Sequence, residues 1–156
     1  MSHRVLFMIS SMRRGGSEQQ TLLLLRHLDR SKFQPHLFVL DRDGEWMPRV
    51  PPDVAVHSYD PAAASAGIYF PGRILRDQTN QVRQLLRQAS IDVVYDRTFQ
   101  MSMIAGRACR QLGVPRVSTI VSPPDQAIPL IESRFVNLKK RRLANAYSQS
   151  RAVVAV

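Results

Sequence analysis

Residues 4–29 read RVLFMISSMRRGGSEQQTLLLLRHLD, in which a strand pattern, a loop and a helix pattern follow one another directly. The run at 4–10 is almost continuously apolar, as is typical of a strand that is buried on both faces. After the loop, Leu22, Leu25 and Leu28 recur at helical spacing. The stretch therefore predicts a β-strand followed by an α-helix, and the junction between them holds two arginines and two glycines.

The same alternation of short strand patterns and longer helix patterns continues along the rest of the chain. Further strands are predicted at 35–40, 54–59, 92–96, 115–121 and 152–156. Helices are predicted at 17–29, 72–90, 100–113 and about 130–147. Strands that alternate with helices form a parallel sheet with helices on both faces. The predicted fold class is therefore α/β, as a single Rossmann-like domain over residues 1–156 with a mainly parallel sheet.

Composition restricts the functional classes that the chain can belong to. Its 156 residues include 44% hydrophobic and 22% charged residues, which suits one globular domain with a real core. No apolar run approaches the roughly 18 residues of a membrane span, and the first residues do not form a signal peptide. Cys109 is the only cysteine, which excludes an internal disulfide and is typical of a reducing compartment. We therefore expect a cytoplasmic location and no zinc site. The net charge of +10 favours anionic partners.

In a parallel sheet, ligands bind beyond the carboxyl ends of the strands, which directs attention to the glycines of the first loop. One interpretation is purely local: Gly15 and Gly16 relieve a tight turn, and Ser17 caps the next helix in a capping box with Gln20. The other interpretation is a ligand-facing loop. Bare backbone, free helix amides and the guanidinium groups of the preceding arginines are what an anion needs. We favour the ligand-facing loop over the plain turn.

The loop does not match the common nucleotide-binding fingerprints. The sequence has no G-x-G-x-x-G, which argues against a dinucleotide site, and no G-K-[ST], which argues against a P-loop NTPase. The segment HRVLFMISSMRRGGSEQQTLLLLRHLDRSKFQPHLFVL at 3–40 instead resembles the amino-terminal domain of the family-4 retaining glycosyltransferases, which have the GT-B fold. The residues that match in order are Gly15, Gly16, Ser17, Glu18, Leu28, Asp29, Arg30 and Phe33. The segment KKRRLANAYSQSRAVVAV at 139–156 resembles the helix and strand that close this domain.

The resemblance implies a hexosyltransferase-type enzyme that moves a sugar from a nucleotide sugar to a hydroxyl acceptor with retained configuration. It implies that Gly15, Gly16, Ser17 and Arg14 face a cleft between two domains, near the donor diphosphate and the acceptor. For Arg13 and Arg14 a solvated surface position is an equal alternative. The family needs no metal and no cofactor, and the resemblance assigns no catalytic residue here.

The resemblance also implies that the nucleotide-gripping domain is absent and would follow Val156, so that this acceptor-side domain alone is inactive. The alternative is a non-catalytic nucleotide- or anion-binding module, for example one subunit of a split transferase.

The loops after the fourth and fifth strands hold further candidates. Many family members carry His–x–His after the fourth strand, with the second histidine at the donor sugar, whereas Tyr95 and Arg97 occupy those positions here. Asp96 and Arg97 are therefore candidate cleft contacts. The alternative is an ion pair of Arg97 with Asp96 or Asp92 that only orders the loop. In SPPD at 122–125, Asp125 either binds acceptor hydroxyls or begins a helix.

The predicted helix at about 130–147 is strongly basic. Its basic residues are Arg134, Lys139, Lys140, Arg141 and Arg142. They form either an ordinary solvated surface or a contact with anionic lipid at the inner face of a membrane. The chain shows no RNA-recognition or helix-turn-helix signature, so no nucleic-acid partner is expected.

Overall fold

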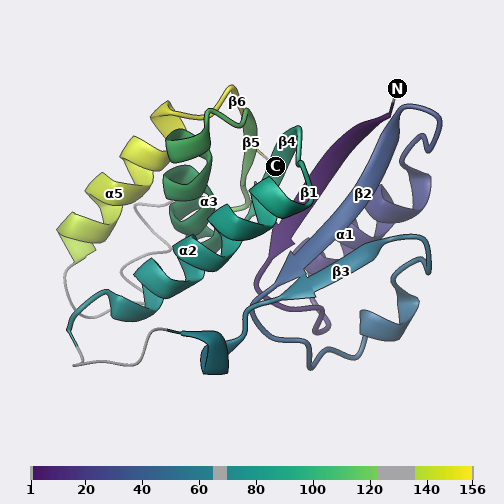
Figure 1. The fold of residues 1–156 in the computed structure, drawn as a ribbon, viewed down its shortest axis with the longest axis horizontal. Coiled ribbons are helices and arrows are strands. Elements are labelled where there is room, and N and C mark those ends of the chain that lie inside the picture. The colour runs from purple at the N-terminus through teal and green to yellow at the C-terminus, as the bar shows by residue number, and fades with distance from the viewer. Residues whose placement is uncertain (1, 65–69, 123–135, 156) are drawn as a thin grey trace.

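The computed structural model describes residues 2–64, 70–122 and 136–155 (Figure 1). Its strands are β1 (His3–Ile9), β2 (Phe33–Val39), β3 (Ala55–Ser58), β4 (Val93–Arg97), β5 (Arg116–Ile120) and β6 (Ala152–Ala155). The α-helices of this part of the chain are α1 (Gly16–His27), α2 (Arg73–Gln88), α3 (Phe99–Leu112) and α5 (Val136–Ser148). Short 3-10 helices span Met47–Arg49 and Pro61–Ala63. No described helix is long and apolar enough to cross a membrane.

The six strands form one sheet in the order β3-β2-β1-β4-β5-β6, and every neighbouring pair is parallel. The predicted α/β fold with a parallel sheet is therefore confirmed. The chain moves outward from β1 in one direction through β2 and β3, and in the other through β4, β5 and β6. The strand order thus reverses between β1 and β4, and ligands of such sheets bind in the crevice at the reversal.

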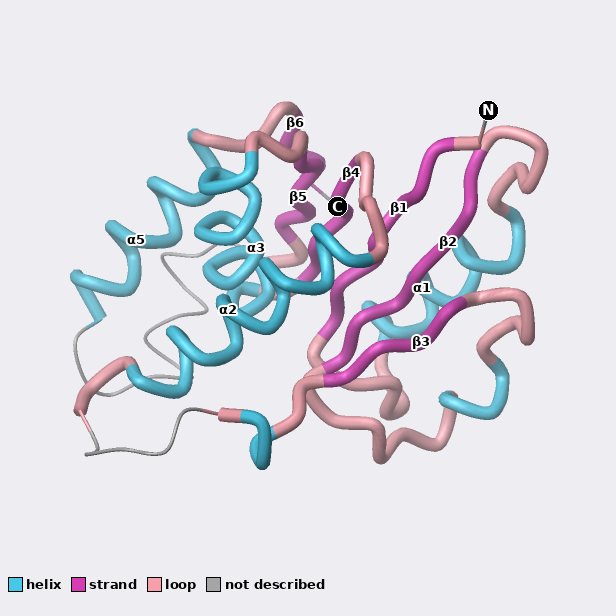
Figure 2. The backbone as a smooth tube through the Cα atoms, viewed as in Figure 1, coloured by secondary structure: helices cyan, strands magenta, loops and turns pink. Residues whose placement is uncertain are grey.

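The two faces of the sheet are covered by different helices (Figure 2). Side chains along β1 point alternately to the two faces, as expected of a strand. Leu6 and Met8 pack in a core with α2 and α3, whereas Phe7 and Ile9 pack in a second core with α1. Both faces of β1 are thus buried, which explains the nearly continuous apolar run that predicts this strand.

Two predicted apolar positions prove to be exposed. Ile74 near the start of α2 has 57% of its surface exposed, although it stands at helical spacing with the buried Val82 and Leu86. Leu138 near the start of α5 is 45% exposed, whereas Leu143 further along the same helix is buried. In both helices the fully buried apolar residues lie beyond the first turn, and Leu75 in the first turn of α2 is only partly buried.

A pair of histidines on β2 and β3 makes the stability of the chain sensitive to pH. The rings of His36 and His57 are stacked, and Nδ1 of His36 lies 3.1 Å from Nε2 of His57. Burial lowers the pKa of His36, and the charge of Arg4 adds to this effect. Burial also lowers the pKa of His57, with further contributions from His36 and Arg42. Each histidine therefore titrates at a lower pH when the chain is folded than when it is unfolded.

Because both folded-state pKa values are depressed, the stability that the neutral pair contributes is complete above the unfolded-state pKa of about 6.5. It is lost as the pH falls through that value toward the folded-state pKa. We expect the free energy of unfolding to drop between about pH 8 and about pH 5. His57→Gln should flatten this dependence in urea titrations, whereas His27→Gln, at an exposed position of α1, should leave it unchanged. An identical pH dependence in wild type and His57→Gln would contradict the prediction.

Candidate functional site

The loop at the carboxyl end of β1, residues 10–16, leads into α1 and is called the glycine loop below. Gly15 is the N-cap residue of α1, and no side chain caps the amides of the first turn. Ser17 lies inside the helix, where its carbonyl oxygen accepts a hydrogen bond from the Thr21 hydroxyl at 2.9 Å. The predicted capping box of Ser17 with Gln20 is therefore wrong. The uncapped amides give this end of the helix a positive potential, and the carboxylate of Glu18 in the first turn lies beside Gly15, so an anion that binds here must displace that carboxylate.

The two glycines of the loop have different surroundings. A Cβ atom added at Gly16 would meet nothing within 4 Å. A Cβ added at Gly15 would lie 2.3 Å from the Glu18 carboxylate, which is the flexible end of a side chain. The fold therefore does not require a glycine at 16 for space, and this position opens to the exterior at the helix N-terminus.

A second loop, residues 41–45 after β2, packs against the glycine loop. Trp46 donates its backbone N–H to the Met12 carbonyl at 2.9 Å. A Cβ added at Gly44 would lie only 2.4 Å from the backbone carbon of Met12, so here the close approach of two backbones does require glycine. The ligand-edge loops of β1 and β2 are thus packed together as one unit.

The arginines of the glycine loop are paired with carboxylates of this second loop. Arg13 donates to Asp41 at 2.7 Å, and Arg14 forms an ion pair with Glu45. The Arg14 side chain is nevertheless 74% exposed. Arg13, Arg14, Asp43, Gly44 and Glu45 line a shallow hollow of ≈ 410 Å³. Charge alternates around this hollow, so the arginines alone do not make it an anion site.

Arg97, at the end of β4, lies buried beside the first turns of α1. Its guanidinium donates a hydrogen bond to the Gln20 side-chain oxygen, and only 3% of the residue is exposed. Its Nε has no hydrogen-bond partner, and no carboxylate of the described residues pairs with it. The ion pair considered from sequence, with Asp96 or Asp92, is not formed. Arg97 is a buried cation, and an anion at this edge would supply the charge that it lacks.

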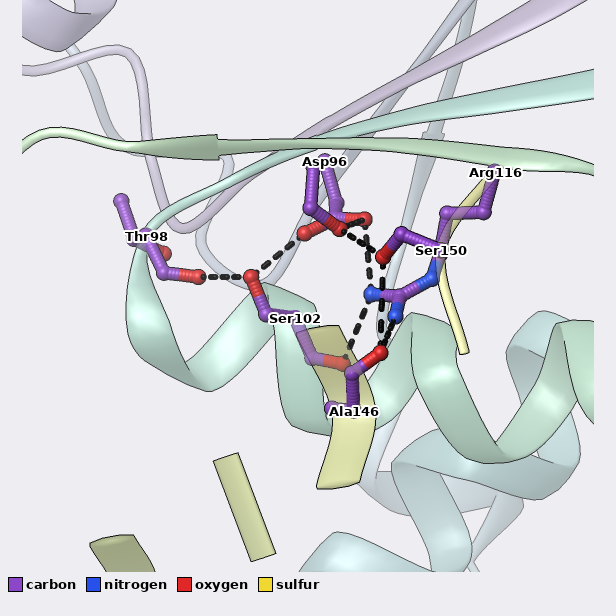
Figure 3. Close-up of polar contacts among 7 residues, drawn as sticks. Asp96, Thr98, Ser102, Arg116, Ala146 and Ser150 are labelled. Carbon is purple, nitrogen blue, oxygen red and sulfur yellow. Dashed lines mark hydrogen bonds and ion pairs between the residues drawn. The ribbon is translucent and has the colours of Figure 1, made fainter. Parts of the chain in front are cut away.

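Asp96 points to the other face of β4 and is fully buried (Figure 3). Its carboxylate accepts hydrogen bonds from Arg116 at 2.9 Å, from Ser118 at 2.8 Å and from Ser102 at 2.5 Å. Burial raises the pKa of Asp96, while the Arg116 guanidinium and the two serine hydroxyls oppose the rise. All of these partners are protein groups, and the carboxylate is buried among them. Asp96 is therefore not placed to make the predicted contact with a ligand in the cleft.

Arg116 links the sheet to two helices and is the residue that sequence reasoning missed. Besides Asp96, its guanidinium donates to the carbonyl oxygens of Ser102 in α3 and Ala146 in α5 (Figure 3). The signal in the sequence is a charged residue at the start of an otherwise uncharged strand pattern, PRVSTIV at 115–121. Taking this charge out of water is costly unless an acid pairs with it, and Asp96 on the neighbouring strand is that acid.

Thr98 connects β4 to the glycine loop. It adopts φ 82°, a value that a threonine rarely takes, and its hydroxyl lies 3.1 Å from the Ser10 hydroxyl at the end of β1. Such backbone strain persists only where the surroundings hold it, and it gathers at functional sites. The strained residue lies directly after Arg97, at the strand-order reversal.

The remaining sequence candidates are placed as follows. Asp125 and Arg134 lie outside the described residues. On α5, Lys139 and Lys140 are partly exposed and Arg141 and Arg142 are exposed. Within the described part of the chain, no group of three or more His, Cys, Asp or Glu side chains could hold a metal ion. Burial raises the pKa of the Cys109 thiol to about 12.

A doubly wound parallel sheet, with a glycine loop at its strand-order reversal, is the Rossmann-like architecture that forms one half of a GT-B fold. The model of Glycosyltransferase Family 4 matches residues 14–156, and the chain belongs to this family. No curated protein matches the chain in a sequence search.

Three solved structures illustrate the similarity of fold. MurG of Acinetobacter baumannii aligns with TM-score 0.62 and 17% identity, over 99% of this chain and 41% of MurG. HepE of Anabaena, in complex with UDP and glucose, aligns with TM-score 0.62 and 16% identity, over 96% of this chain and 37% of HepE. Sucrose-phosphate synthase of Thermosynechococcus elongatus gives TM-score 0.65 and 11% identity, over 97% and 41%. The chain thus spans less than half the length of each of these proteins.

Proposed function

We propose that this domain is the acceptor-side wall of a retaining glycosyltransferase that moves a hexose from a nucleotide sugar to a hydroxyl group. The observation that carries the proposal is the buried, carboxylate-free Arg97 beside the uncapped N-terminus of α1. Family membership supplies the reaction class. The complex of HepE with UDP and glucose is consistent with a nucleotide sugar as donor.

The chemistry of the proposed reaction matches these groups. Transfer breaks the bond between the anomeric carbon of the sugar and the diphosphate, so negative charge develops on the departing phosphate. Helix amides and a guanidinium that are already fixed in place stabilise such charge without reorganising. In this proposal the first turn of α1 binds the diphosphate, and open space at Gly16 admits it close to the backbone. Arg97, held by Gln20, contacts the phosphate or the donor sugar.

Gly16→Val tests the proposed approach of the ligand to the backbone. The added side chain enters open space, so the domain should fold with unchanged stability. The valine side chain would occupy the space that the ligand needs near the backbone. A displacement of a bound substrate by about 1 Å can lower the rate by about 100-fold. We expect a loss of that order in a sugar-transfer assay of the complete enzyme.

Gly16→Ala is the graded control, with a smaller loss expected. Full turnover by a well-folded Gly16→Val enzyme would leave the glycine loop with only a role in the turn. Unfolding of the variant, followed by circular dichroism, would also contradict the prediction, because it would show that the fold itself requires this glycine.

We also propose that α5 contacts anionic lipid at the inner face of a membrane. Arg141 and Arg142 are exposed on this helix, and the exposed Leu138 lies one turn before them. Each basic residue at such a surface contributes about 1 kcal/mol of attraction. The chain should co-sediment with vesicles that contain anionic lipid at low salt and be released as salt screens the charges. Lys140→Gln with Arg141→Gln should weaken this binding. Equal binding to neutral vesicles, or none to acidic ones, would contradict it.

A further inference from the structure

A groove on the helical layer combines three arginines that have no acidic partner among residues 2–64, 70–122 and 136–155. It lies between α3 and α5, with the start of α2 at its side, and encloses ≈ 160 Å³. Its floor is narrow because α3 and α5 approach closely: a Cβ added at Gly106 would lie 3.0 Å from the Ala146 Cβ. Polar side chains dominate its rim, which consists of Arg107, Arg110, Arg142, Asn145 and Gln149.

The charges around the groove are all of one sign. Arg107 and Arg110 extend from α3 and Arg142 from α5, and no aspartate or glutamate among the described residues lines the groove. None of the ion pairs and hydrogen bonds among the described residues satisfies these three guanidinium groups. Burial lowers the pKa of Arg107, and repulsion from Arg142 and Arg110 adds to the effect. Like charges held together at a partly buried groove gain stability only when an anion joins them.

We propose that this groove binds a phosphate group. Guanidinium groups match phosphate oxygens with paired hydrogen bonds, which a single ammonium cannot do. The amide of Asn145, already joined to Gln149 at 3.0 Å, offers a further donor at the rim. The small volume admits one tetrahedral anion rather than a peptide, and within the described part of the chain no aromatic side chain lines the groove for a nucleic-acid base.

The groove is separate from the proposed sugar-transfer site. Arg107 and Arg110 lie in the second half of α3, away from the carboxyl ends of the strands. The glycine loop and Arg97 lie at those carboxyl ends. The inference therefore goes beyond the proposed reaction, and its failure would leave that reaction untouched. The groove shares only Arg142 with the proposed lipid-binding surface of α5. Its binding of phosphate is therefore tested first in the absence of a membrane.

The first experiment measures binding of inorganic phosphate to the full chain by calorimetry, with chloride at equal ionic strength as reference. Wild type should bind phosphate, and Arg107→Gln with Arg110→Gln and Arg142→Gln should weaken binding by about 100-fold, since each partly exposed ion pair with phosphate contributes up to about fivefold. The matched control removes the same charge elsewhere, with Arg49→Gln, Arg87→Gln and Arg151→Gln, and should change binding by less than about twofold.

A second arm distinguishes a lipid headgroup from a free phosphate, using vesicles of phosphatidylcholine with phosphatidic acid. The groove variant is the triple variant Arg107→Gln, Arg110→Gln and Arg142→Gln. If it loses vesicle binding while the control variant does not, and if inorganic phosphate competes with the vesicles for wild type, the groove binds a phosphate on a lipid. If wild type binds inorganic phosphate and the groove variant binds vesicles as well as wild type does, the groove binds a soluble phosphate. Equal losses in the groove variant and the control would overturn the site, because they would report net charge only. Failure of wild type to bind either probe would overturn it as well.

Discussion

Arg116→Met is expected to destabilise the chain by about 3–5 kcal/mol, because it leaves the buried carboxylate of Asp96 without its cation. The loss extends beyond the ion pair, since Arg116 also donates to the carbonyl oxygens of Ser102 and Ala146. Buried carbonyl groups that lose their donors add their own cost. Urea unfolding followed by circular dichroism measures the change. A variant that stays within about 1 kcal/mol of wild type would contradict this account of the network.

The double variant Asp96→Leu with Arg116→Met is the informative control. It removes both charges together, and replacing a buried ion pair by apolar groups of similar size is often neutral. We expect it to recover most of the charge-related loss, because the Ser102 hydroxyl keeps the Thr98 carbonyl at 3.1 Å and the Ser118 hydroxyl keeps Ser150 at 3.0 Å. The carbonyl oxygens of Ser102 and Ala146 still lack the Arg116 donor. Equal destabilisation in the single and double variants would show that packing, rather than charge, sets the cost.

The second large effect concerns catalysis by the isolated chain. Its sheet and two cores should unfold in one cooperative step. Its donor binding should nevertheless be weak, because at the carboxyl edge of the described sheet the contacts for a diphosphate are limited to the α1 N-terminus, Arg97 and the nearby arginines. Transfer requires donor and acceptor to be held together, and that positioning provides a large part of the rate enhancement. We expect turnover on the order of 1000-fold or more below that of the chain combined with a donor-binding domain.

Calorimetry with nucleotide sugars and a sugar-transfer assay test this expectation. A donor-binding GT-B domain, fused to the chain or added in trans, should restore tight binding and transfer. If the 156-residue chain alone binds the donor tightly and turns it over, the proposal that a second, donor-binding domain is needed is wrong. Binding of nucleotide without transfer, even in the presence of the second domain, would favour the non-catalytic module.

The order of strands and helices can be predicted from the sequence because each element carries its own hydrophobic period. The apolar run of β1 reflects burial on both faces, and the spacing of Leu22 and Leu25 reflects the face of α1 that packs on the sheet. The glycine loop is located by the same reasoning, since ligands of parallel sheets bind at the carboxyl ends of strands. These features depend on residues that are close together in the chain.

The partners of the charged residues could not be predicted, because they depend on strand register. Asp96 and Arg116 are twenty positions apart and meet only because β4 and β5 pair in parallel, with Asp96 opposite Ser118. Asp96 therefore satisfies Arg116, and Arg97, its neighbour on the opposite face, is left without an acid. The ion pairs of Arg13 with Asp41 and of Arg14 with Glu45 likewise depend on how the loops after β1 and β2 pack.

The central place of β1 has a consequence for how the chain folds. Its partner on one side, β2, follows within the next thirty or so residues, but on the other side Val5 pairs with Val93 in β4. A long stretch of chain must be synthesised before that edge is covered, and closing so distant a contact is slow. During synthesis the first strand therefore presents an edge of unpaired backbone groups between two apolar faces, the kind of surface that aggregates unless it is shielded. Chaperone dependence should accordingly be greatest before β4 emerges from the ribosome.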